Sequence, residues 1–182
     1  MKKTAMLFAN GFEEVEALTV VDLLRRAEIA CDIVALDGAA TVTGSHGIAV
    51  GADKAFEDVT LDAYDALLLP GGQPGTTNLG NDERVLSLLK EFNAAGKLTA
   101  AICAAPTVLA KAGLLEGKRA ICYPGLEGKL TGATPEIEPV VVDGTVITSR
   151  GVGTAIDFAL ALVAYLDSDE RAEALAESIV YF

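Results

Sequence analysis

Tryptophan is absent from this chain of 182 residues, histidine occurs once, and cysteine occurs three times. A single histidine cannot form a histidine-rich metal site, and the sequence has no Cys-x-x-Cys pair. Three cysteines do not form a disulfide framework in a chain of this length, and their odd number fits a reducing compartment. The sequence therefore predicts neither a metal site nor a bound cofactor.

Basic residues are also scarce, since the chain has 14 lysines and arginines but 26 acidic residues, which gives a net charge of −12. An acidic chain is not expected to bind nucleic acid, because phosphate binding requires a basic surface. No apolar run approaches the roughly 20 residues that cross a bilayer. The first apolar stretch is cut off at Asn10-Gly11, so it indicates a strand rather than a signal peptide. We expect a cytoplasmic protein without a membrane partner.

Short apolar runs alternate with helical patterns, as in proteins built from βαβ units around a parallel sheet. The chain is predicted to form a single domain, residues 1–182, with helices on both faces of a mostly parallel sheet. A Gly-containing excursion at 41–50 has the pattern of a hairpin, and Asp143-Gly144 predicts a two-residue turn. The expected strands are 4–9, 31–36, 65–69, 98–102, 120–123, 140–142 and 145–149, and the expected helices are 13–27, 82–95, 106–112, 154–166 and 170–180.

The acidic cluster at the start of the first predicted helix contains one residue that differs from the others. The helical pattern places Val15 on the apolar stripe and Glu14 on the exposed side. Carboxylates at a helix start interact favourably with the helix dipole, which accounts for Glu13 and Glu14. Glu16 falls on the inner side, where a carboxyl near a thiolate would have a raised pKa and could transfer a proton.

The segment Ala101-Ile102-Cys103-Ala104-Ala105 joins a predicted strand to a predicted helix. A nucleophile elbow places its reactive residue on such a turn and needs small residues two positions before and after it. The N–H of Ala104 would lie at the helix start and face the sulfur, so we expect the thiol pKa of Cys103 to lie below its ordinary value.

The alternative for Cys103 is a small buried side chain, which is the commonest environment of a free cysteine. The local pattern alone leaves these two interpretations about equally supported. Cys31 and Cys122 lie within strand patterns without an elbow, and we expect both to be inert core residues.

Three further positions follow or flank predicted strands and are candidates for binding. Gly72 belongs to the turn after strand 65–69, where it can bring a second N–H donor to an oxyanion or simply form the turn. Arg150 follows a strand and is a candidate to bind a substrate carboxylate. His46 would be the partner of any Cys–His pair, although solvent exposure is the expectation that we favour for a single loop histidine.

Four motifs in order along the chain resemble the DJ-1/ThiJ/PfpI superfamily, and in particular its DJ-1-like branch. They are Ala9–Glu16, Asp65–Gly72, Ala100–Thr107 and Thr148–Thr154. The resemblance implies a flavodoxin-like (Rossmann-like) three-layer fold, a homodimer and an easily oxidised cysteine. It assigns Cys103 as the nucleophile, Glu16 as its carboxylic acid partner, and Gly72 and Ala104 as backbone donors. Arg150 matches an arginine near the pocket and the dimer contact.

The sequence departs from the family pattern at two functional positions. Tyr123 stands before a proline where relatives often carry histidine, and tyrosine cannot act as a base near neutral pH. His46 occupies the excursion that often presents an arginine to the active site. The segment 125–139 is also shorter than in close relatives, which would open the pocket.

Our preferred hypothesis is a cysteine-dependent enzyme that acts on small reactive carbonyls, such as a glyoxalase that converts methylglyoxal to lactate or a deglycase. The second hypothesis is a non-catalytic redox sensor whose Cys103 is oxidised to the sulfinate, and the third is a chaperone in which the cysteine is incidental. Peptidase chemistry of the PfpI branch is disfavoured because the histidine is missing.

Overall fold

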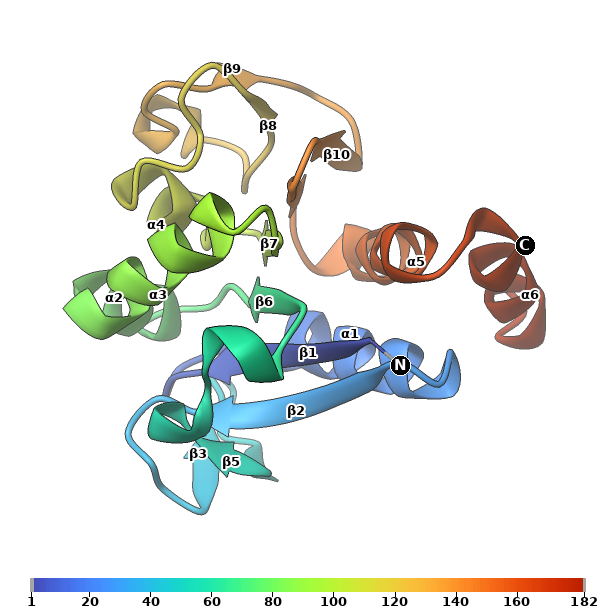
Figure 1. Cartoon of the computed structure of the whole chain (residues 1–182), viewed down its shortest axis with the longest axis horizontal. Coiled ribbons are helices and arrows are strands. Elements are labelled where there is room, and N and C mark those ends of the chain that lie inside the picture. Colours follow the sequence, from blue (N-terminus) through green and yellow to red (C-terminus); the bar gives the residue numbers. More distant parts are fainter. Residues whose placement is uncertain (1, 182) are drawn as a thin grey trace.

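The centre of the fold is a parallel sheet (Figure 1). The computed structural model describes residues 2–181, so Met1 and Phe182, the ends of the predicted domain, lie outside the described residues. Within this range seven strands form one sheet in the order β10-β11-β7-β6-β1-β2-β5. Neighbouring strands are parallel except for the antiparallel pair of β10 and β11. The expectation of a mostly parallel sheet is confirmed.

Most of the predicted elements are present in the predicted order with small shifts at their ends, and α2, β5 and β9 are additional elements that were not predicted. The strands are β1 (Lys3–Phe8), β2 (Ala30–Ala35), β3 (Thr41–Thr43), β4 (Ala49–Gly51), β5 (Lys54–Ala55), β6 (Ala66–Leu69), β7 (Leu98–Ile102), β8 (Arg119–Ala120), β9 (Thr134–Pro135), β10 (Val140–Asp143) and β11 (Val146–Ser149). The α-helices are α1 (Glu14–Arg26), α2 (Gly75–Asn81), α3 (Glu83–Ala94), α4 (Pro106–Lys111), α5 (Ala155–Leu166) and α6 (Asp169–Ser178). Short 3-10 turns include η3 (Glu127–Lys129).

Helices cover both faces of the sheet because its central strands are apolar on both sides. Every residue of β6 and β7 is buried. One buried cluster includes the apolar faces of α3 and α4, and a second includes those of α1 and α5. The result is a three-layer α/β sandwich, as predicted. No helix within residues 2–181 is both long and apolar enough to span a membrane.

The strand order reverses beside β1. The chain adds β2 on one side of β1, and later places β6 and then β7 on the other side. In open parallel sheets the crevice at such a reversal, outside the carboxyl ends of the strands, is where ligands bind. The residues that follow β1, β6 and β7 therefore meet at one edge of the sheet.

The first turn of α1 contradicts the predicted orientation of two side chains. Glu14 is buried, with 4% of its surface exposed, whereas Val15 is 49% exposed. The cause is the hairpin of β3 and β4, whose turn folds over the helix start and surrounds the Glu14 carboxylate with donors. The predicted hairpin at 41–50 is confirmed. Because its turn packs on the start of α1, Glu14 is buried and Val15 is exposed, the opposite of the prediction.

The predicted strand 120–123 is largely wrong. Only Arg119–Ala120 is extended, and it pairs with β9 in a separate two-stranded sheet rather than with the central sheet. Cys122 and Tyr123 follow this strand as irregular chain. A short apolar run indicates burial but does not specify which partner the backbone pairs with.

Candidate active site

Cys103 follows the last residue of β7 and adopts a left-handed backbone conformation with φ of 65°. Non-glycine residues rarely adopt positive φ, and the strain persists only where neighbouring contacts hold it. Two hydrogen bonds do so, because the Cys103 N–H donates to Ser149 O at 3.0 Å and its carbonyl accepts from the Tyr123 N–H at 2.7 Å. The predicted strand-to-helix turn is therefore present, with α4 beginning at Pro106.

Small residues allow this turn to pack tightly. Ala101 and Ala105 are fully buried on either side of Cys103. A β-carbon added at Gly71 would lie 2.5 Å from the Cys103 β-carbon and 2.5 Å from Glu16 Oε2. Gly71 is therefore required where the turn after β6 passes the cysteine. This role of Gly71 was not predicted, although the double glycine after a buried strand was the available signal.

Glu16 lies on the inner face of α1 with no exposed surface. Its Oε2 accepts a hydrogen bond from the Gly71 N–H at 3.0 Å, and its carboxyl is hydrogen-bonded to the Cys103 thiol. Oε1 is buried and has no hydrogen-bond partner among residues 2–181. The helix start is fixed by Glu13, whose carboxylate accepts from the Glu16 N–H at 2.7 Å. Glu13 was predicted only to compensate the dipole, and its cap bond was not predictable because glutamate is not among the usual N-cap residues.

Burial raises the pKa of the Glu16 carboxyl to about 7, and the nearby charge of Glu13 acts in the same direction. Burial and the Glu16 charge raise the pKa of the Cys103 thiol to about 12. The N–H groups of Ala104 and Gly72 donate to the sulfur and lower this pKa, as expected, but they do not outweigh the other effects. The prediction of a lowered thiol pKa was therefore wrong. The helix behind the sulfur has only six residues, so its dipole is small.

The two groups titrate as a pair because they are in hydrogen-bond contact. The pair releases its first proton near pH 7 and its second near pH 12, and between these values it holds one proton. Two N–H donors face the sulfur, whereas one N–H donor contacts the carboxylate. The site therefore provides stabilising donors for a thiolate beside a neutral carboxylic acid.

A cavity of about 580 Å³ opens over these groups. Tyr123 is 53% exposed and Val152 is 48% exposed at its wall, and Arg150 also lines it. Gly151 leaves room beside the acid, since a β-carbon added there would lie 3.7 Å from Glu16 Oε1. The other lining residues are Glu13, Glu16, Gly72, Cys103, Pro124, Gly153 and Thr154.

His46 does not line this cavity. It is exposed, as favoured from the sequence, and its Nδ1 lies 2.8 Å from Glu14 Oε2. Glu13, Glu14 and His46 place possible metal-ligand atoms within 4.8 Å of one another. The Glu14 oxygens, however, already accept hydrogen bonds from the backbone and side chain of His46. This arrangement holds the hairpin against α1 and has the geometry of an internal hydrogen-bond network.

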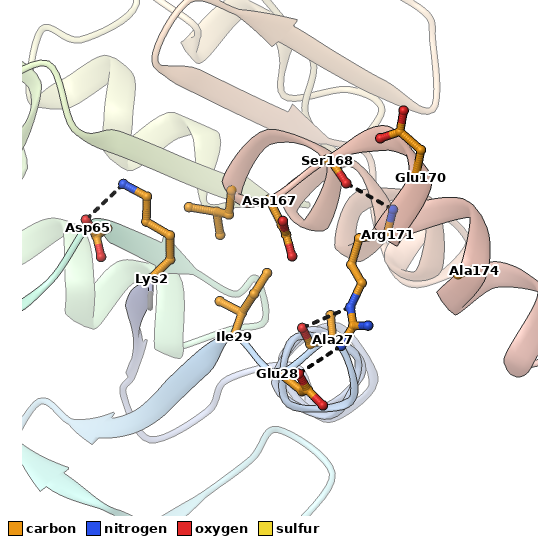
Figure 2. Close-up of a pocket in the computed structure, with 11 residues that line it drawn as sticks. Lys2, Ala27, Glu28, Ile29, Asp65, Asp167, Ser168, Glu170, Arg171 and Ala174 are labelled. Atoms are coloured by element: carbon orange, nitrogen blue, oxygen red, sulfur yellow. Dashed lines mark hydrogen bonds and ion pairs between the residues drawn. The ribbon is translucent and has the colours of Figure 1, made fainter.

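Cys31 and Cys122 are buried, and burial raises the pKa of each thiol to about 11. A larger hollow of about 880 Å³ lies near the opposite, amino end of the strands (Figure 2). Its two cations are paired, Lys2 with Asp65 and Arg171 with Glu28, as the dashed lines in Figure 2 show, and Cys103 is not among the residues that line it. The cavity at Cys103 is therefore the candidate active site.

Curated relatives match most of this chain. It is 38% identical over 183 residues to protein dj-1beta of Drosophila melanogaster, covering 99% of this chain and 98% of that protein. It is 36% identical over 181 residues to DJ-1 homolog B of Arabidopsis thaliana, where 98% of this chain spans only 41% of the relative. A protein of Pyrococcus abyssi named as a deglycase is 36% identical over 156 residues, covering 83% of this chain and 91% of the relative.

Solved structures of DJ-1 proteins also match this chain over nearly its whole length. A cysteine-to-alanine mutant of a DJ-1 superfamily protein from Salmonella typhimurium superposes with a TM-score of 0.93 at 38% identity, covering 99% of this chain and 98% of that one. Toxoplasma gondii DJ-1 in an oxidized form gives 0.94 at 34% identity, with 99% and 98% coverage. The family model described as the DJ-1/PfpI family matches residues 2–165. This chain therefore belongs to the DJ-1/PfpI family.

Proposed function

We propose that this protein is a cysteine-dependent enzyme that converts small α-oxoaldehydes, such as methylglyoxal, to hydroxy acids. The observation that carries the proposal is the pairing of Cys103 with a buried carboxyl whose pKa is raised to about 7, beneath an open cavity. A group that titrates near neutral pH is suited to general acid–base catalysis. The deglycase name of the archaeal relative supports carbonyl chemistry.

In the first step of the proposed reaction, the Cys103 thiolate attacks the aldehyde carbon and forms a carbon–sulfur bond. The carbonyl electron pair moves to oxygen, which takes the proton from neutral Glu16 to give a hemithioacetal. The N–H groups of Gly72 and Ala104, which face the sulfur in the free protein, stabilise the negative charge as it moves from sulfur to oxygen.

In the second step the Glu16 carboxylate removes the proton from the carbon that bears sulfur, and the ketone oxygen takes up a proton to give an enediol. The first hydroxyl then loses its proton as Glu16 returns the carbon proton to the adjacent carbon. Oε1 is suited to this transfer because it is buried without a partner beside the space at Gly151. The product is an isomer of the hemithioacetal, a thioester of the hydroxy acid. Water then hydrolyses the thioester, which releases lactate and the thiol. One methylglyoxal and one water give one lactic acid.

Conversion of methylglyoxal to lactate by the wild type and by the Cys103→Ser variant tests the function. We expect Cys103→Ser to lose the activity and Cys122→Ser to keep it, because only Cys103 lines the cavity. Buffer and free-thiol controls are required because methylglyoxal reacts with both. Equal lactate production by wild type and Cys103→Ser would refute the proposed function.

A second candidate function is redox sensing, which the exposure of the three cysteines favours. Cys103 is partly exposed, whereas the other two are buried. Peroxide would oxidise the thiolate to the sulfenate and then the sulfinate, with one water released per peroxide. Intact-protein mass spectrometry after mild peroxide should then show two added oxygens on Cys103. Oxidation distributed over all three cysteines would contradict this function.

A further inference from the structure

A crevice of about 180 Å³ between α2 and α4 lies outside the cavity at Cys103 and has a distinct composition. The two helices lie side by side on one face of the sheet (Figure 1), and η3 completes the wall. Nine residues line the crevice, and two of them, Lys111 and Lys129, are cationic. None of the nine is acidic, although acidic residues outnumber basic ones 26 to 14 in the chain.

Hydrogen-bond donors in the crevice exceed the acceptors that the described residues offer them. The Lys111 ammonium donates to Gly80 O at 2.6 Å and lies 3.4 Å from Asn81 Oδ1. Within residues 2–181, the Lys129 ammonium forms no hydrogen bond or ion pair, and the side-chain amide N–H groups of Gln73 and Asn81 donate to no protein acceptor. Lysine and amide donors without acceptors favour an anion.

Thr76 supplies an independent observation. The residue is only 4% exposed, it lines the crevice, and its buried hydroxyl oxygen has no hydrogen-bond partner in the described part of the chain. A buried hydroxyl usually finds a partner, because leaving it unpaired in the protein interior is unfavourable. A small rotation of the Thr76 side chain would turn this hydroxyl toward an oxyanion in the crevice, which would accept its hydrogen bond together with those of the lysines.

We propose that the α2–α4 crevice binds a phosphate group, either as inorganic phosphate or as the monoester of a small metabolite. Its size favours one small anion, since pockets for larger organic ligands usually measure about 300–1,000 Å³. Phosphate offers several acceptor oxygens, which match the several donors among the lining residues Lys111, Lys129 and Thr76. This binding is independent of the carbonyl chemistry proposed for Cys103.

Calorimetric titration with inorganic phosphate and with glycerol 3-phosphate, in a phosphate-free buffer at constant ionic strength, tests the proposal. We expect saturable binding, about tenfold weakening in Lys129→Gln and several-fold weakening in Thr76→Val. Lys129 is exposed and Thr76→Val preserves shape, so both variants should fold, and a thermal melt verifies it. Lys90→Gln on α3 is the matched control, because it removes the same charge from another exposed lysine.

The relative affinities of the two probes distinguish a phosphorylated metabolite from free phosphate as the ligand. Tighter binding of glycerol 3-phosphate than of phosphate would support a phosphorylated metabolite as the ligand, and equal affinities would support free phosphate. Cys103→Ser should bind both probes like the wild type, so failure of the carbonyl activity leaves this test intact. Absence of saturable binding up to about 10 mM, where a site of millimolar affinity saturates, would overturn the proposal. So would equal weakening by Lys90→Gln and Lys129→Gln.

Discussion

Glu16 combines features that a structural residue at a helix start does not need. It is completely buried, one of its oxygens has no partner, and its pKa is raised to about 7. A carboxyl group that only compensated the helix dipole would stabilise equally well at an exposed position. These features are those of an acid–base group that is held ready to exchange a proton with its neighbour.

We therefore predict that Glu16→Gln removes most carbonyl turnover while the fold is retained. Glutamine keeps the shape and hydrogen-bonding capacity but has no transferable proton, and positioned acid–base groups contribute about 10²–10⁴-fold. The measurement is lactate production with a parallel thermal melt. Glu83→Gln, which replaces an acidic residue in the first turn of α3, is the matched control and should keep full activity. Full turnover by Glu16→Gln would assign the acid–base role to another group.

Gly71→Ala tests the close approach of the turn after β6 to the cysteine. The added methyl group would lie 2.5 Å from the Cys103 β-carbon, so the backbone must shift. Overpacking of this kind costs about 1–3 kcal/mol, and we expect a loss of stability and of cysteine reactivity. Denaturant unfolding and alkylation rates measure the two effects. Gly128→Ala is the control, because nothing lies within 4 Å of its added β-carbon. An unaffected Gly71→Ala would show that the turn adapts.

At the scale of elements, the start of α1 and the hairpin of β3 and β4 are fixed to each other by Glu14. Its Oε1 accepts from the His46 N–H at 2.7 Å, and its Oε2 lies 2.8 Å from the His46 ring. Burial opposes ionisation of Glu14, but the hydrogen bonds from His46 and Ile48 outweigh it and lower the pKa to about 2. The same contact raises the pKa of His46.

This pairing predicts a pH-dependent contribution of His46 to stability. Because the folded pKa of His46 is raised, its contribution is present below the unfolded value of 6.5 and is lost as pH rises through the folded value. The Glu14 contribution is present above 4.5 and is lost as pH falls toward 2. The difference in melting temperature between wild type and His46→Gln should therefore be largest between about pH 4.5 and 6.5. In a Glu14→Gln background it should vanish, whereas a pH-independent difference would contradict the pairing.

Sequence patterns predicted the features that depend on residues adjacent in the sequence. The elbow at Cys103 was predictable because strand, turn and small flanking residues are contiguous. The burial of Glu14 was not, because it depends on a hairpin that is distant in sequence. The predicted direction of the Cys103 pKa shift was also wrong. Glu16 lies on another element, α1, and burial and the Glu16 charge outweigh the local N–H donors. The α2–α4 crevice likewise joins segments that no local pattern connects.

At the scale of the whole molecule, several apolar side chains remain exposed on adjoining elements. Val15 on α1 is 49% exposed, Ile48 in the hairpin is 53% exposed, and Ile156 on α5 is 37% exposed. Helices α1 and α5 are in contact, and the hairpin packs on the start of α1. A surface of this kind is typical of a protein interface, and we propose that it pairs with a second copy of the chain.

Sedimentation at micromolar concentration should therefore show a homodimer. Val15→Glu should shift the protein toward the monomer, because two symmetry-related charges would be buried in a two-fold interface. Val180→Glu, at another exposed valine that lies beyond the end of α6, is the control and should remain dimeric. A wild-type monomer at micromolar concentration would refute the homodimer.

The central claim is that Cys103 and Glu16 share one proton between about pH 7 and pH 12. The pH dependence of Cys103 alkylation tests it most directly, because only the thiolate reacts. In the singly protonated pair the proton can lie on Glu16 and leave a thiolate, so we predict that the wild-type rate rises first with a midpoint near pH 7 and again near pH 12, when the second proton leaves. In Glu16→Gln the step near pH 7 should disappear and leave a single rise at higher pH, since burial still opposes ionisation. A wild-type rate that stays flat until about pH 12, or the same profile in both proteins, would contradict the shared proton.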